Sequence, residues 1–150
     1  MMFELRDLYE EMILEHNRNP RNFSKKPAGA NHSGYGFNPL CGDEFHVHLT
    51  ISDGVITDVG FDGAGCAIST ASASIMTETL IGKPVSEVRA LFDRTHEMFV
   101  GDAEADVDDI GKVAVLAGVR DYPTRIKCAT LAWHVMKAAL EGSGETICTE

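Results

Sequence analysis

The spacing of apolar residues divides the chain into a helical start, a strand-rich middle and a helical second half. Apolar residues at helical spacing predict an N-terminal amphipathic helix: Leu5, Leu8, Tyr9, Met12 and Ile13. This helix should end before Pro20, which disfavours helical backbone at the residue preceding it. Residues 24–40 are rich in Gly, Pro, Ser and Asn and predict a loop, with one short strand near Ser33 to Phe37.

A strict alternation of apolar and polar residues follows. Phe45, Val47, Leu49 and Ile51 alternate with polar residues, and a Ser-Asp-Gly turn leads into a second apolar run that ends at Phe61. Two such runs joined by a short turn predict an antiparallel β-hairpin.

Helical spacing returns after residue 66. We expect helices over residues 67–81, 86–99, 110–119 and 122–142, with Ser86 capping the second and Gly142 ending the last. Strands precede helices, so the fold class is α+β, with a small antiparallel three-stranded sheet packed against a layer of helices. At 150 residues the chain is expected to be one domain, 1–150, with a mobile tail at 143–150.

Charge and cysteine usage narrow the function. The net charge of -10 opposes binding to nucleic acid and to anionic membranes, so a protein partner is favoured. The N-terminus lacks the pattern of a secretory signal, and we expect a cytoplasmic protein. The four cysteines are too few for a secreted disulfide scaffold, so reduced thiols are expected.

Three cysteines and one aspartate are candidates for a metal site. Cys41 precedes the hairpin, Cys66 follows it, and Cys128 lies in the first turns of the last helix. Because a hairpin brings its ends together, Cys41, Asp43 and Cys66 can be neighbours, and three sulfurs with one carboxylate would complete a tetrahedral zinc site. Four anionic ligands leave a net charge of about -2 on such a site, which nearby Arg125 and Lys127 could offset. Three inert buried cysteines and a turn aspartate would give the same pattern, and spacing alone does not decide between the two readings.

Other polar residues carry weaker signals. His46 and His48 alternate with the apolar strand residues, so we expect them on the outer face of the sheet, solvated or facing a partner. The acidic segment at residues 101–109 lacks the glycine of an EF-hand loop, and Cys148 in the tail is interpreted as incidental.

Four segments resemble a known family: LYEEMILEHNRNPRNF, NPLCGD, GAGCAISTASAS and RIKCATLAW. Together they are similar to the IscU-type family of NifU N-terminal-like proteins, and specifically to its SufU branch. The resemblance covers nearly the whole chain. Scaffold members of the family have a histidine where this chain has Lys127, and they carry a Leu-Pro-Pro-Val-Lys chaperone site where this chain reads DYPTRI. An additional segment at about residues 98–118 also matches the SufU branch.

The resemblance implies zinc-dependent sulfur transfer. Cys41 matches the acceptor of persulfide sulfur from a pyridoxal-phosphate cysteine desulfurase of the SufS type, and the sulfur would pass to a downstream iron-sulfur assembly complex. Cys41, Asp43, Cys66 and Cys128 would ligate Zn²⁺, with Arg125 in support. Two alternatives remain: a scaffold holding a transient [2Fe-2S] cluster on the same ligands, and a zinc domain whose metal only supports the fold.

Overall fold

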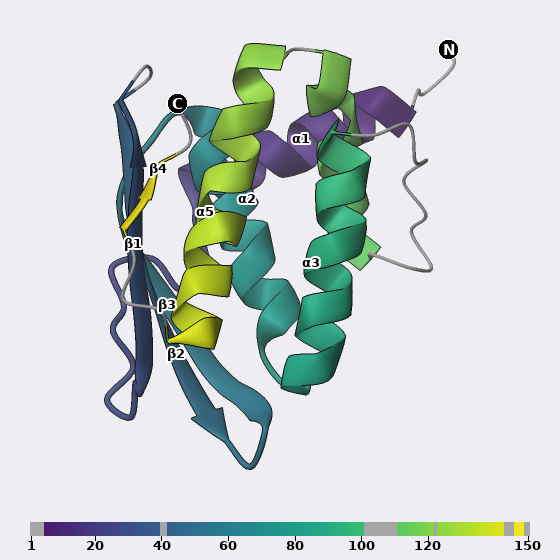
Figure 1. Cartoon of the computed structure of the whole chain (residues 1–150). Coiled ribbons are helices and arrows are strands. Elements are labelled where there is room, and N and C mark those ends of the chain that lie inside the picture. The colour runs from purple at the N-terminus through teal and green to yellow at the C-terminus, as the bar shows by residue number, and fades with distance from the viewer. Residues whose placement is uncertain (1–4, 40–41, 101–110, 122, 143–145, 149–150) are drawn as a thin grey trace.

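The structure, a computed structural model, describes residues 5–39, 42–100, 111–121, 123–142 and 146–148 (Figure 1). Its elements in chain order are α1 (Leu5–Arg18), β1 (His32–Asn38), β2 (Asp43–Ser52), β3 (Val55–Ala64), α2 (Ala67–Leu80), α3 (Val85–Val100), the 3₁₀ helix η1 (Gly111–Asp121), α5 (Pro123–Glu141) and β4 (Thr146–Cys148). Most predicted elements are therefore found, although α3 begins at Val85, so Ser86 lies inside the helix that it was expected to cap.

The sheet has four strands in the order β3-β2-β1-β4. The first three are antiparallel as expected, but β4 pairs in parallel with β1, so the prediction of three antiparallel strands is wrong. A strand of three residues is too short to show an alternating pattern, and it forms here because β1 offers an unpaired edge. Ile147 also packs against the core, although this segment was expected to be a mobile tail.

The helices cover one face of the sheet, as Figure 1 shows. Helix α5 lies close against β1 because Gly34 and Gly36 have no side chains: a Cβ at Gly34 would lie 2.6 Å from the carbonyl oxygen of Val135. Phe45, Val47 and Leu49 point from β2 into the same layer, where each is at most 1% exposed. The alternation read from the sequence thus predicts the buried face correctly.

The small side chains of α2 allow close packing against α5. Ser72 is fully buried, donates its hydroxyl to the carbonyl of Ala129 at 2.6 Å and accepts the indole N–H of Trp133 at 3.1 Å. The buried Ser72 hydroxyl thus both donates and accepts a hydrogen bond where the two helices meet. In the part of the chain that the structure describes, no helix is both long and apolar enough to cross a membrane.

Candidate metal centre

Asp43, Cys66 and Cys128 converge at one end of the sheet. One ligand atom from each of the three lies within 4.8 Å of the others. The residues come from the start of β2, the segment before α2 and the first turns of α5. Asp43 and Cys128 are buried, and Cys66 is partly exposed. Residues far apart in the chain therefore form one cluster of two thiols and a carboxylate.

The hairpin positions two of these groups. Glu44 pairs with Ala64 in the β2–β3 register, so Asp43 and Cys66 extend from the same end of the strand pair. Gly65 permits a close approach, because a Cβ there would lie 2.8 Å from the ring of Phe45 and 3.3 Å from Asp43 Oδ1. On the other side Gly42, with a φ of 74°, donates its N–H to the carbonyl of Asn38.

Asp43 also binds the start of α2. The Cys66 N–H donates to Asp43 Oδ1 at 2.9 Å, and the Ser69 hydroxyl donates to Asp43 Oδ2. The Ser69 Oγ also lies 3.4 Å from the Cys66 sulfur. Sequence reasoning missed Ser69, although its place three residues after Cys66 is where a side chain can reach back to a helix start. These hydrogen bonds tie Asp43 to the start of α2 whether or not a metal is bound.

The surroundings of Cys66 favour the thiolate form of its side chain. Burial and the negative charge of Asp43 raise the pKa of Cys66, but hydrogen bonds with Ser69 and Cys128 outweigh them, so the pKa of the thiol lies below its ordinary value. The exposed guanidinium of Arg125 faces both sulfurs, and the negative charge of Cys66, followed by the hydrogen bond to Cys128, raises the pKa of Arg125. A Cys66 thiolate beside the guanidinium of Arg125 suits a metal ligand, because metals bind the deprotonated form of cysteine.

The donor set fits a zinc ion. Bond lengths of about 2.3 Å to sulfur and about 2.1 Å to oxygen at a tetrahedral angle place the two ligand atoms about 3.6 Å apart. Cys66 Sγ lies 3.9 Å from Asp43 Oδ2, so only a small adjustment is needed. Thiolates also ligate iron in [2Fe-2S] clusters, so the ligand types suit either group.

Not every predicted site residue can be placed. Cys41 lies outside the described residues, so its position relative to the cluster stays a prediction. Cys148 is exposed on β4 in register with Phe37, and it is not part of the metal-binding group found among the described residues. Lys127 is exposed on α5 beside Cys128.

The two strand histidines differ from expectation. His46 is exposed on the outer face of the sheet, whereas His48 is only 7% exposed. The alternation gave the correct face for both, but it could not show that the outer face is covered beside His48. A segment containing Lys25 and Pro27 approaches Gly60, the residue paired with His48.

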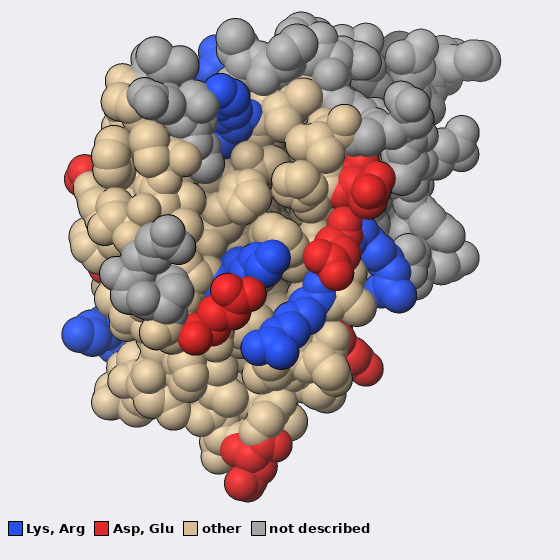
Figure 2. Space-filling view, viewed as in Figure 1, with Lys and Arg blue, Asp and Glu red and all other residues tan. Residues whose placement is uncertain are grey.

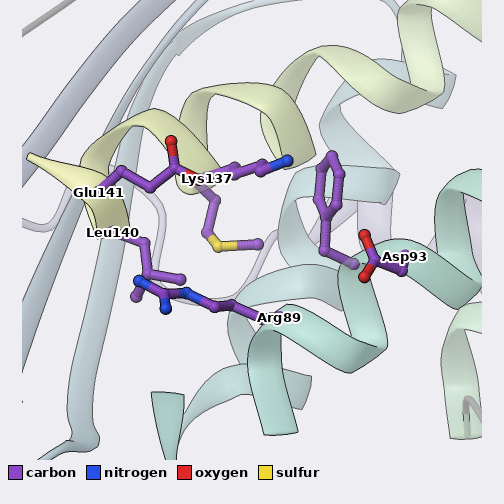
Figure 3. Close-up of a pocket in the computed structure, with 7 residues that line it drawn as sticks. Arg89, Asp93, Lys137, Leu140 and Glu141 are labelled. Atoms are coloured by element: carbon purple, nitrogen blue, oxygen red, sulfur yellow. The ribbon is translucent and has the colours of Figure 1, made fainter. Parts of the chain in front are cut away.

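A separate cavity of about 460 Å³ lies between α3 and α5 (Figure 3). Arg89, Asp93, Lys137 and Glu141 line it, and the Lys137 ammonium lies 4.7 Å from the centre of the Phe92 ring. None of its lining residues is a cysteine, so it is distinct from the metal centre. Figure 2 shows acidic and basic side chains side by side on the face viewed there, so that face is not uniformly acidic despite the net charge.

Comparison with known proteins places the cluster in context. The model of the NifU-like N terminal domain family matches residues 8–129. The iron-sulfur cluster assembly scaffold protein IscU of Thermotoga maritima is 38% identical over 94% of this chain and 96% of its own length. The zinc-dependent sulfurtransferase SufU of Bacillus subtilis is 35% identical over 87% of both chains. Among solved structures, one described as a putative iron-sulfur cluster assembly scaffold protein for the SUF system, from Fervidobacterium islandicum, is 31% identical, with a TM-score of 0.81 over 91% of this chain and 99% of that one.

Proposed function

The chain belongs to the NifU-like N-terminal domain family, and on that premise we propose that it is a zinc-dependent sulfurtransferase for iron-sulfur cluster assembly. It takes persulfide sulfur from a pyridoxal-phosphate cysteine desulfurase and passes it to the assembly complex. The observation that carries this proposal is the convergence of Asp43, Cys66 and Cys128, of which Asp43 stands two residues after Cys41. Lys127, in the position that holds a histidine in scaffold members, favours transfer over the scaffold role.

Cys41 is the proposed sulfur acceptor. Because it stands two residues before Asp43, its Cα lies within about 7.6 Å of that of Asp43 whatever the local backbone. Its thiolate attacks the outer sulfur of the desulfurase persulfide and breaks the sulfur–sulfur bond, so the desulfurase cysteine leaves as a thiolate. The persulfide on Cys41 holds the transferred sulfur, and no external oxidant or reductant is needed.

The remaining residues hold and balance the centre. Asp43, Cys66 and Cys128, with Cys41 as the fourth ligand, would hold Zn²⁺, and the bound ion would favour the deprotonated thiolates at neutral pH. Arg125 lies beside Cys66 and Cys128 and offsets the excess negative charge of four anionic ligands. Its exposure also leaves it accessible to a partner surface.

A scaffold role is the second candidate. The same ligand types bind a [2Fe-2S] cluster, and the relatives from Thermotoga maritima and Streptococcus pyogenes are both named as IscU scaffold proteins. In that case the chain is a binding module, and iron and sulfide are its cargo. The two roles differ in whether the resident metal is zinc and whether Cys41 turns over.

A desulfurase assay separates these roles. Sulfide release by a cysteine desulfurase is measured with the wild-type chain, with Cys41→Ser, with zinc-stripped protein and with Cys148→Ser as the matched cysteine control. Sulfur transfer predicts acceleration by the wild type and Cys148→Ser alone. No acceleration by any form, together with stable cluster uptake from iron and sulfide without oxygen, would replace transfer with the scaffold role. A Cys41→Ser protein whose main defect is a lower melting temperature would indicate a structural zinc domain.

A further inference from the structure

A second group of metal-ligating side chains lies on the outer face of the sheet. His46 and His48 on β2 both face Asp62 on β3, which pairs with His46 in the strand register. His46 Nδ1 lies 3.4 Å from Asp62 Oδ1, and His48 Nε2 lies 3.3 Å from Asp62 Oδ2. The two imidazole rings are nearly parallel, with an interplanar angle of 9° and centroids 6.3 Å apart. The carboxylate is thus placed against one nitrogen of each ring.

Each of these two separations, taken alone, matches that of two ligands on one ion, although they involve different oxygens of Asp62. Two ligand atoms about 2.0–2.1 Å from one zinc-like ion, at a tetrahedral angle, lie about 3.3–3.4 Å apart. His48 and Asp62 also form a direct hydrogen bond at 3.3 Å, which is long compared with the typical nitrogen–oxygen distance of about 2.9–3.0 Å. A neutral imidazole nitrogen is also a ligand that suits zinc and nickel ions.

One histidine of the pair is already oriented. His48 is 7% exposed, and its Nδ1 lies 2.9 Å from the Ser33 hydroxyl, which fixes the ring with Nε2 directed at Asp62. A partner on the second ring nitrogen is the usual support of a histidine metal ligand. The His46 side chain is 49% exposed, and its ring lies tilted against that of Tyr35, with centroids 4.4 Å apart. The three ligand atoms do not all converge within 4.8 Å as those of the metal centre do, so His46 is the ligand that must turn.

We propose that His46, His48 and Asp62 form a second binding site for a divalent transition metal of the zinc, cobalt and nickel class. The site uses two imidazole nitrogens and a carboxylate, with water completing the coordination of the ion. Binding draws the half-exposed His46 ring toward Asp62 and leaves His48 where Ser33 holds it. The site does not depend on the proposed sulfur transfer, because it shares no ligand with Cys41, Asp43, Cys66 and Cys128.

The test is a titration of the full chain after it has been loaded with one equivalent of zinc. Co²⁺ is added and followed by calorimetry and by visible absorption, since a cobalt ion bound to cysteine gives a thiolate charge-transfer band and one bound to imidazole and carboxylate does not. We expect one further equivalent without that band. His46→Asn and Asp62→Asn should weaken this binding by at least tenfold, and Ser33→Ala by about tenfold. His96→Asn, which removes a histidine from α3, should change nothing.

Three results would overturn the proposal. They are the absence of a second equivalent in the wild type, a second equivalent that carries the thiolate band, and unchanged cobalt binding in both His46→Asn and Asp62→Asn. Because His46 and Asp62 are half-exposed, these variants should keep their fold, and circular dichroism checks this. NMR on the Co²⁺-loaded protein gives an independent readout, since the signals of His46 and His48 should be displaced or broadened while those of His96 are not.

Discussion

Replacing Asp43 with alanine should destabilise the protein even when no metal is present. The carboxylate is 2% exposed and accepts hydrogen bonds from the Cys66 N–H and the Ser69 hydroxyl. Hydrogen bonds to a charged group contribute about 1.5–3 kcal/mol each, so losing two costs about 3–6 kcal/mol. Removing a buried carboxylate also ends its desolvation penalty, so we expect a net loss of about 2–4 kcal/mol in the free energy of unfolding.

Urea unfolding in the presence of a chelator measures this loss, because metal binding cannot then add to the stability of the folded state. Asp43→Asn keeps an acceptor for the Cys66 N–H and should lose less than the alanine variant. Asp93→Ala is the matched control: its side chain is exposed and has no hydrogen bond or ion pair within the described residues, so its loss should stay within about 0.5 kcal/mol. If Asp43→Ala unfolds at the same urea concentration as Asp93→Ala, Asp43 does not hold the start of α2.

Further substitutions test the packing and the electrostatics of the helices. Gly34→Ala places a Cβ 2.6 Å from the carbonyl oxygen of Val135, so thermal or urea unfolding should show a loss of about 1–3 kcal/mol, whereas Gly118→Ala, with no atom within 4 Å, should be neutral. Equal losses would contradict close packing of α5 on β1. Trp133→Phe removes the indole N–H that donates to α2 and should cost about 1–2 kcal/mol, and an unchanged stability would contradict a role for this bond. Burial, followed by the positive charges of neighbouring histidine and lysine side chains, lowers the pKa of His134 below 6.5. The unfolded state then takes up a proton that the folded state excludes, so stability should fall as pH drops below 6.5, and His134→Gln should flatten this dependence in urea unfolding at a series of pH values.

The sequence predicts the parts of the fold whose signal is local. Alternation over Phe45 to Ile51 predicts both the strand and its buried face. Strand β4 could not be predicted from a local pattern, because three residues are too few to show an alternation. The strand is stabilised by its pairing with the edge of β1. The burial of His48 could not be predicted for a similar reason. Alternation predicts the face of the sheet on which His48 lies, but its burial depends on a loop that is distant in the sequence.

In the candidate site, too, some residues have a local sequence signal and others do not. The Cys-Gly-Asp turn and the cysteine before a small-residue helix point to Asp43 and Cys66 from the sequence, since a hairpin joins them. Ser69 could not be found in this way, because buried serines also serve helix packing on α2. The charge arithmetic of the ligands pointed to Arg125, and the structure places its guanidinium beside Cys66 and Cys128.

The most direct test of the central claim is to locate the transferred sulfur. The zinc-loaded chain is mixed with a cysteine desulfurase and cysteine without reductant, thiols and persulfides are alkylated, and each cysteine peptide is analysed by mass spectrometry. Sulfur transfer predicts one additional sulfur on the peptide of Cys41 and none on that of Cys148. An unmodified Cys41, or additional sulfur on Cys148 alone, would contradict the role of Cys41 as the acceptor.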